Sequence, residues 1–279
     1  MKIKKIQTRF GIKEIEMIPW NGKEIPRFVY KYRDWKNEYH KRLLLHQELY
    51  LSSPDEFNDP FDCKIPVAYY LLKEDKNLEN IFLQQYIEKH YHNLSEQKKK
   101  EKFNLLKNKG NYKNNKVIEQ INSEIQEYIN TTAGIFCASA INDIILMWSH
   151  YANAHTGFCV GFDSKKLFNF FTDGGPVNYE KDFPLIKPTE SKSEQWMKQI
   201  FSKSDIWDYE IEYRLHKQNA PKTVCKIPKE TIKKIIIGYK MPQSDMDDLK
   251  KIINCELPHV NLYKTEPAKN EYKLETKKI

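Results

Sequence analysis

Residues 134–163 read GIFCASAINDIILMWSHYANAHTGFCVGFD, and they carry the clearest succession of elements in the chain. Residues 135–138 are a short apolar run between a glycine and a serine, which predicts a buried strand. The apolar residues that follow recur at helical spacing, so one face of a helix should pack inward. They are Ile144, Ile145, Met147, Trp148 and Tyr151. Residues 158–162 predict a second strand that can lie beside the first.

The predicted helix also carries side chains that can do chemistry. A side-chain oxygen of Asn142 or Asp143 can cap its first turn, and the helix should end before Gly157. Large aromatic residues at this spacing are most often core, and a histidine beside them is often a core residue too. Several of these aromatic side chains also carry polar groups, and they lie close in sequence to a turn at Gly157. This combination favours a functional site instead. The side chains concerned are Trp148, Ser149, His150 and Tyr151, with His155 one turn later.

Composition places the chain among globular proteins. With 279 residues it can form one large domain, or a domain with an insertion, around a sizeable core. Its five cysteines are odd in number and include no Cys-x-x-Cys pair, which argues against a disulfide framework and against a zinc site. Free thiols, no signal peptide and no apolar run of about 18 residues predict a cytoplasmic protein without membrane association. The net charge of +8 favours polyanionic partners.

The N-terminal part of the chain begins with a loosely alternating segment. Residues 1–26 predict an N-terminal arm or an edge hairpin that turns at Pro19 and Pro26. Residues 27–279 are then expected to form a single domain. It should open with a strand, a helix and a second strand, over residues 28–32, 37–46 and 48–51.

Residues 52–62, SSPDEFNDPFD, are rich in turn-forming residues. Asn and Asp bond their own backbone and Pro fixes its angle, so this segment predicts a pinned loop anchored by Phe57 and Phe61. The loop can be a plain turn or the edge of a ligand site. Asn58, Asp59 and Asp62 could also hold a divalent cation.

Residues 75–130 are more polar than the segments on either side of them, and they predict a lysine-rich helical insertion. Apolar residues recur at helical spacing among Glu, Lys, Asn and Gln, as in two or three amphipathic helices. Lysines crowd the region from Lys98 to Lys116, which we expect to be peripheral. The region can face a nucleic acid or a protein target, although a run of charge is most often a solvated face.

Residues 209–215, YEIEYRL, alternate strictly between apolar and charged side chains. Strand side chains alternate faces, so Glu210, Glu212 and Arg214 should share one face. Such a row can be a surface charge ladder. Two neighbouring carboxylates can also shift a pKa or grip a ribose.

The remaining pattern predicts an α+β fold with a mixed, mostly antiparallel sheet. Helices are expected over residues 165–171, 191–204 and 243–254, the last introduced by Ser244, and residues 174–176 should form a turn. Strands are expected at 177–179, 235–238, 260–265 and 272–275. No Gly-x-Gly-x-x-Gly, Walker A, His-Glu-x-x-His or Gly-x-Ser-x-Gly motif occurs, which argues against Rossmann, P-loop, zincin and hydrolase folds.

Several segments of the chain form a pattern of aromatic and polar residues. They are Tyr30-Lys31-Tyr32-Arg33, FNDPFD at 57–62, LMWSHYA at 146–152 with His155, Gly157 and Phe158, and finally Lys203, Trp207, Tyr209, Glu210, Glu212 and Arg214. Together they resemble the bacterial family named domain of unknown function 2971, over most of the chain from residue 28 to about residue 240.

A more distant resemblance is to the ADP-ribosyltransferases. The order of elements is similar: an aromatic and basic strand, a helix, a short strand, then GIFCA before a helix, and a late strand with a Glu-x-Glu pair. The resemblance implies NAD as the substrate, Tyr151 as the wall of the nicotinamide site, and Glu212, or else Glu210, as the catalytic acid. Many members place a histidine on the first strand, where this chain offers Lys31 or Arg33. The full set of implied NAD-binding residues is Lys31, Arg33, Ser149, His150, Asn58, Asp59 and Arg214, and no metal site is implied.

Three functions follow as hypotheses. The first is an NAD-consuming effector that modifies a nucleic acid or a protein, in phage defence or as a toxin. Its chemistry needs a carboxylate, an aromatic wall and cations for the pyrophosphate. The second is a non-catalytic module that binds a nucleic acid or another partner. The third is a metal-dependent nuclease that would use Asn58, Asp59, Asp62, Glu210 and Glu212 with His150.

Overall fold

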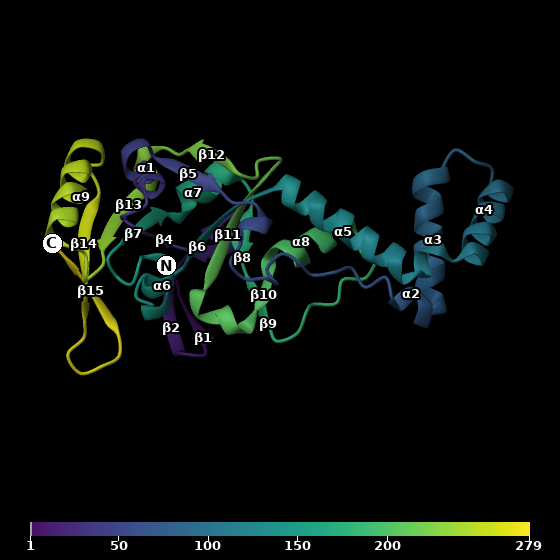
Figure 1. Ribbon diagram of the computed structural model, residues 1–279, viewed down its shortest axis with the longest axis horizontal. Coiled ribbons are helices and arrows are strands. Elements are labelled where there is room, and N and C mark those ends of the chain that lie inside the picture. The colour runs from purple at the N-terminus through teal and green to yellow at the C-terminus, as the bar shows by residue number, and fades with distance from the viewer. Residues whose placement is uncertain (1) are drawn as a thin grey trace. The chain divides into compact units, whose positions relative to one another are not determined.

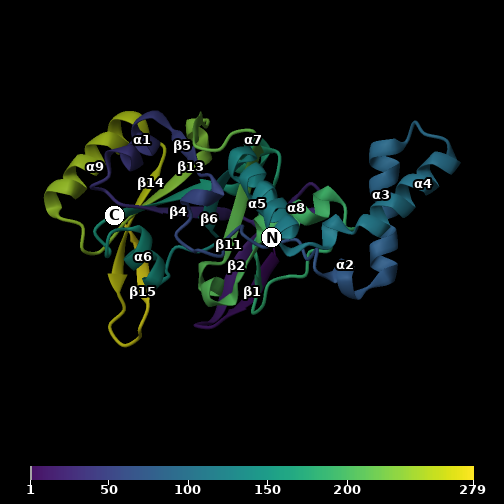
Figure 2. The same ribbon diagram turned by 45° about the vertical axis from the view of Figure 1, so that its right-hand side comes forward.

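The computed structural model describes residues 2–279 and divides them into two compact units, which we treat separately (Figures 1 and 2). The sheet unit comprises residues 2–56, 132–179 and 205–279. The helical unit comprises residues 57–131 and 180–204. No helix among residues 2–279 has the length and apolar character needed to cross a bilayer.

An eight-stranded sheet forms the centre of the sheet unit (Figure 1). Its neighbours are antiparallel except for one parallel pair, β13 with β14, which confirms the predicted mixed, mostly antiparallel sheet. In spatial order the strands are β15 (Leu274–Lys278), β14 (Asn261–Pro267), β13 (Ile232–Ile237), β7 (Phe158–Asp163), β4 (Phe28–Arg33), β6 (Ala133–Ser139), β11 (Glu212–Gln218) and β8 (Gly174–Pro176).

Residues 134–163 fold as the predicted strand, helix and strand, but the two strands are not neighbours in the sheet. β6 and β7 were expected side by side, but β4 lies between them. β4 supplies Tyr32, whose ring packs edge-on against Trp148 of α6 (Ile145–Tyr151). Phe136 of β6 stacks on Phe171 of α7 (Ser164–Phe171). Packing against helices explains why β6 and β7 read as apolar runs instead of alternating strands.

Residues 2–26 form a separate three-stranded antiparallel sheet, made of β1 (Lys2–Thr8), β2 (Gly11–Trp20) and β3 (Lys23–Pro26). The predicted turn at Pro19 is wrong, because Pro19 lies inside β2 opposite Glu24. The chain turns instead at Asn21 and Gly22, whose φ angles are 44° and 74°. Positive φ at both positions is the requirement of a two-residue hairpin turn, which Asn-Gly meets at low cost.

Other predicted elements are present with small changes at their ends. α1 (Glu38–His46) begins at Asn37, whose side chain accepts a hydrogen bond from the Tyr39 amide, and β5 (Glu48–Leu51) follows. β12 (Thr223–Lys226), which the sequence pattern did not indicate, pairs with β5. α9 (Gln243–Glu256) begins after Pro242 and not at Ser244. The shorter segments are η1 (Pro54–Glu56), η4 (Lys229–Thr231), β9 (Asn178–Glu180) and β10 (Ser202–Ser204).

The turn predicted at residues 174–176 is wrong, because these residues form β8 and pair with β11. Gly174 is the reason that the pairing is possible. Its φ of 159° is extended, and a Cβ placed there would lie 2.7 Å from the carbonyl oxygen of Arg214. Glycine therefore marks a close approach of two strands here, and not a reversal of the chain.

The helical unit contains the helices expected over residues 75–130. They pack on a small core that includes Val67, Leu72 and Ile186. The amide side chain of Asn122 accepts a hydrogen bond from the Val67 N–H at 2.9 Å and donates one to the Val67 carbonyl. The helices are α2 (Leu71–Glu74), α3 (Lys76–Tyr91), α4 (Glu96–Lys109), η2 (Asn111–Lys113), α5 (Asn115–Thr132) and α8 (Lys192–Phe201).

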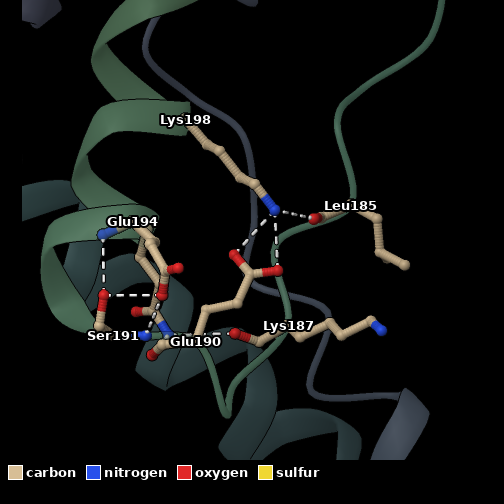
Figure 3. A network of polar contacts seen from close by, with 7 residues as sticks. Leu185, Lys187, Glu190, Ser191, Glu194 and Lys198 are labelled. Atoms are coloured by element: carbon tan, nitrogen blue, oxygen red, sulfur yellow. Dashed lines mark hydrogen bonds and ion pairs between the residues drawn. The ribbon is translucent and has the colours of Figure 1, made fainter.

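α8 begins with a capping box at Ser191 (Figure 3). The Ser191 hydroxyl accepts a hydrogen bond from the Glu194 amide, and the Glu194 carboxylate accepts one from the Ser191 amide at 2.8 Å. Lys198, further along α8, donates to the Leu185 carbonyl and to the Glu190 carboxylate. These bonds hold the segment before the helix against the helix itself.

Candidate functional site

β4 and β6 meet at a seam that is closed by one residue pair among the described residues, Tyr30 with Ser139. Further along β6, Ile135 bridges to Ser52 instead. Between these two points the Cys137 carbonyl accepts a hydrogen bond from Lys31 Nζ at 2.6 Å. A lysine side chain thus satisfies a strand carbonyl on the edge of β6 that faces β4. We call this place the β4–β6 seam.

Lys31 at the seam is a half-buried cation with an altered pKa. Burial and the charge of Arg33 lower its pKa to about 8, while Glu212 and Glu210 act in the opposite direction. Burial also lowers the pKa of Arg33, although a guanidinium keeps its charge at neutral pH. Of the two cations implied by the resemblance, Lys31 donates a side-chain hydrogen bond to β6.

Glu210 comes to the seam from a 3₁₀ helix and not from a strand. η3 (Asp205–Glu210) precedes β11, and Ile211 between them has a φ of 42°. The expectation that Glu210 and Glu212 share one strand face is therefore wrong. Its physical reason is the left-handed residue between them, which breaks the alternation on which the prediction rested.

Two of the three predicted catalytic residues are in direct contact. The Tyr151 hydroxyl on α6 donates a hydrogen bond to Glu210 Oε1 at 2.9 Å. The Glu210 main chain is held as well, because the Ser139 hydroxyl donates to its carbonyl at 2.6 Å. Glu210 is buried, so its carboxylate is positioned by α6 while its backbone is positioned by β6.

Glu212 is engaged by Arg214 on the same strand. Arg214 Nε and Nη2 donate to the two carboxylate oxygens at 2.8 and 3.2 Å, and the Arg214 side chain is 0% exposed. A surface charge ladder is therefore wrong for these residues. In the β6–β11 register Glu212 lies opposite Ser139, and Arg214 lies opposite Cys137. Burial and the Glu212 charge raise the pKa of the Cys137 thiol, which keeps it protonated.

Ser149 and His150 of α6 have surroundings of their own. The Ser149 hydroxyl donates to the Ile145 carbonyl at 3.0 Å and lies 3.2 Å from His155 Nε2. Because that hydroxyl is already donating, His155 Nε2 carries the proton. His150 is exposed, and its ring lies edge-on to Tyr151. Among residues 2–279, Ser149 makes no hydrogen bond to Glu210.

The start of α6 differs from the prediction that Asn142 or Asp143 caps it. Ile144 occupies the cap position and no side chain bonds the first turn. The Asn142 carbonyl accepts a hydrogen bond from Trp148 Nε1 at 2.8 Å, and Asp143 pairs with Lys13 at 2.9 Å. The Trp148 side chain and the distant Lys13 therefore hold this segment in place of a side-chain cap.

Asn58, Asp59 and Asp62 belong to the helical unit. Asp59 is buried and accepts a hydrogen bond from the Phe61 amide at 2.9 Å, which confirms a pinned turn. Phe61 is an exposed residue and does not anchor the loop in a core. Asp62 lies 3.7 Å from Lys203 Nζ. Across residues 2–279, no three His, Cys, Asp or Glu side chains gather as a site that could hold a metal ion.

Two residues at the site escaped prediction. Ser139 was read only as the end of a strand, and its hydroxyl joins Glu210 to β6. Tyr179 accepts a hydrogen bond from the Glu212 amide at 2.8 Å through its phenolic oxygen. The polar residue closing an apolar run was a usable indication for Ser139. No local pattern marks Tyr179, because its partner lies 33 residues away.

A separate cavity of about 520 Å³ lies beside the tip of the β14–β15 hairpin, residues 267–274. Ile145, His155 and Tyr239 complete its lining. Burial and the charge of Lys240 lower the pKa of His155, so this histidine is neutral at pH 7. The cavity does not include Lys31, Tyr151, Glu210 or Glu212 among its lining residues.

Comparison with known proteins gives a match that covers residues 147–215. Comparisons with curated proteins and with solved structures give no match. A family model described as "Protein of unknown function (DUF2971)" matches residues 147–215. The matched segment runs from α6 to β11 and includes Tyr151, Glu210, Glu212 and Arg214. This match supports the resemblance to domain of unknown function 2971 over that segment.

Proposed function

We propose that the sheet unit carries an NAD-consuming site of the ADP-ribosyltransferase type, which transfers ADP-ribose to a nucleic acid or a protein in phage defence or as a toxin. The observation that carries the proposal is the hydrogen bond between Tyr151 and Glu210, beside the cation of Lys31. An aromatic residue, a carboxylate and a cation are the three groups that the reaction requires.

The proposed reaction breaks the bond between the ribose C1 and the nicotinamide nitrogen. The bonding electron pair leaves with nicotinamide, the acceptor nucleophile attacks C1, and that nucleophile loses its proton. Glu210 would stabilise the positive charge that develops on the ribose, and Tyr151 would form the wall for the nicotinamide ring. Lys31 and Arg33 would hold the pyrophosphate.

Glu210 is a better candidate than Glu212 for the catalytic carboxylate. Both oxygens of Glu212 already accept hydrogen bonds from the fully buried Arg214. The charge of Arg214 offsets the negative charge of Glu212, whereas Glu210 directly contacts Tyr151, the proposed wall of the nicotinamide site. We therefore assign Glu212 to positioning, although the ADP-ribosyltransferase resemblance itself favours it as the acid.

Nicotinamide release from NAD tests the proposal. Glu210→Gln should lower the rate at least about 100-fold, which corresponds to about 2.7 kcal/mol in the barrier. Glu14→Gln is the matched control, because Glu14 is an exposed residue of β2 whose partner is Lys5, and its rate should equal that of the wild type. Wild-type protein that neither binds NAD nor releases nicotinamide, with nucleic acid or protein acceptors present, would refute the proposal.

A non-catalytic binding module is the second candidate. The buried Glu212–Arg214 pair and the hydrogen bonds from Tyr151 and Ser139 to Glu210 are also what a purely structural polar network contains. Under this function, Glu210→Gln would lower thermal stability and change no turnover. The nuclease hypothesis has no group of metal ligands in its favour among the described residues.

A further inference from the structure

One face of α4 in the helical unit carries a row of lysines. Lys98, Lys102 and Lys109 are separated by four and seven residues, a spacing that places them on one side of a helix. Leu105 lies on the same face and is exposed. The surrounding segment, residues 98–116, contains eight lysines and one glutamate. We refer to Lys98, Lys102 and Lys109 as the lysine row.

Three other lysines of this segment already have partners. Lys99 pairs with Glu88 and Glu96, and Lys113 pairs with the buried Glu79. Lys107 donates to Asn80 at 2.7 Å. No carboxylate lies within ion-pair distance of the lysine row among residues 2–279. The lysine row therefore places three lysines without an ion pair in the described part of the chain on one face of α4, while Lys100 and Lys116 are exposed elsewhere in the segment.

Aromatic rings lie next to this row, on the end of α3. Lys102 Nζ is 5.7 Å from the centre of the Tyr91 ring. Tyr86 lies 6.4 Å from Tyr91 and 4.3 Å from His90, centre to centre, and Tyr86 is 38% exposed. α3 and α4 lie side by side in both views (Figures 1 and 2). We refer to Tyr86, His90 and Tyr91 as the aromatic cluster.

We propose that this face of the α3–α4 hairpin binds single-stranded nucleic acid. The lysine row would contact successive phosphates, and bases would stack on the aromatic cluster. Stacking on an exposed ring needs an unpaired base, which a duplex does not offer. An acidic protein would use the lysines alone and leave the rings without a role. This binding is independent of the proposed NAD site, which lies in the other unit.

Fluorescence anisotropy with a labelled single-stranded oligonucleotide of mixed sequence tests the inference. Changing Lys98, Lys102 and Lys109 together to Glu should weaken binding at least about tenfold. The slope of log affinity against log salt should become shallower by about 2, since each phosphate contact on a single strand contributes about 0.7. Changing Lys76, Lys100 and Lys116 together to Glu is the matched control. These three lysines are exposed, lie off the row and give the same change in net charge.

A second variant separates stacking from charge. Tyr86→Leu keeps an apolar side chain on α3 and should weaken binding of the single strand at least about threefold, within the range expected for one stacked base. The same change should leave binding of the matching duplex unaltered, and circular dichroism should show the wild-type helix content. Equal losses in both lysine triples, equal affinity for duplex and single strand, or no binding at low salt would each overturn the proposal.

Discussion

Trp148 and Tyr151 lie three residues apart on α6 but have different surroundings. Trp148 is 0% exposed and packs on Tyr32, whereas Tyr151 is half-buried with its hydroxyl on Glu210. Trp148→Ala should lower the free energy of unfolding by about 3–5 kcal/mol, because it empties a large buried volume. Tyr151→Phe should cost less, about 1.5–3 kcal/mol, because it removes one hydrogen bond to a carboxylate. Chemical denaturation measures both changes.

The same two variants distinguish core from site. Tyr151→Phe should reduce nicotinamide release by more than its loss of stability explains. If Tyr151→Phe and Trp148→Ala destabilise the protein equally, both residues serve the core and the assignment of Tyr151 to the site fails.

Lys31 should make stability depend on pH in the alkaline range. Its pKa is about 8 in the folded protein, where burial opposes the charge, and about 10.4 in an unfolded chain. Between these values the unfolded state binds more protons, so the contribution of Lys31 to stability rises with pH. Denaturation at several pH values from 7 to 11 should show this rise in the wild type and a weaker rise in Lys31→Met. Parallel curves for the two proteins would contradict the lowered pKa.

At the scale of the element, the first turn of α8 depends on its capping box. Ser191→Ala removes the side-chain oxygen that accepts from the Glu194 amide, so it should cost about 1 kcal/mol (Figure 3). Thermal unfolding followed by circular dichroism would detect it. Ser123→Ala, within α5 and away from any cap, is the control and should change little. A loss of the same size in both variants would exclude the cap as the cause.

α3 contains a buried carboxylate that should make the helical unit sensitive to acid. Burial raises the pKa of Glu79, but hydrogen bonds from Lys113 and Tyr112 outweigh burial and hold the pKa below its usual value. A lowered pKa stabilises the fold above the unfolded value of about 4.3, and this stabilisation is lost as pH falls through the folded pKa. Glu79→Gln should cost about 1.5–3 kcal/mol at pH 7 and flatten the dependence below pH 5.

Denaturation between pH 3 and pH 7 measures this effect. The Glu79→Gln and wild-type curves should converge as the solution becomes acidic. A constant difference across the range would mean that the Glu79 charge does not contribute.

Elements with a clear period were predictable from sequence, and the exceptions have local causes. In these elements the pattern of apolar residues matches the face or faces that the element buries. Examples are the strands around residues 28–33 and 158–163 and the helices of residues 75–130. η3 escaped prediction because residues 209–211 alternate like a strand, and one left-handed residue ends that alternation. β8 escaped because glycine marks turns far more often than close strand pairs.

At the scale of the whole molecule, the sequence predicted which residues could form the candidate site. It did not predict which of them are in contact. Tyr151 and Glu210 were both singled out, yet they are 59 positions apart and only tertiary packing joins them. The register that places Glu212 opposite Ser139 depends on β11 lying next to β6. Sequence periodicity reports which face is buried and says nothing about which strand is the neighbour. The resemblance to ADP-ribosyltransferases favours Glu212 over Glu210, and only the tertiary structure shows that Arg214 pairs with Glu212.

The β4–β6 seam has a consequence for motion. β4 is paired to β7 at six residues but to β6 at one among the described residues, so the seam is the weakest line across the middle of the sheet. Local opening there should need less free energy than opening between β4 and β7. Hydrogen exchange should accordingly be faster for the amides of residues 136–139 that face β4 than for the β4 amides that face β7. Such local opening would expose Lys31 intermittently and give a ligand access to the buried carboxylate of Glu210.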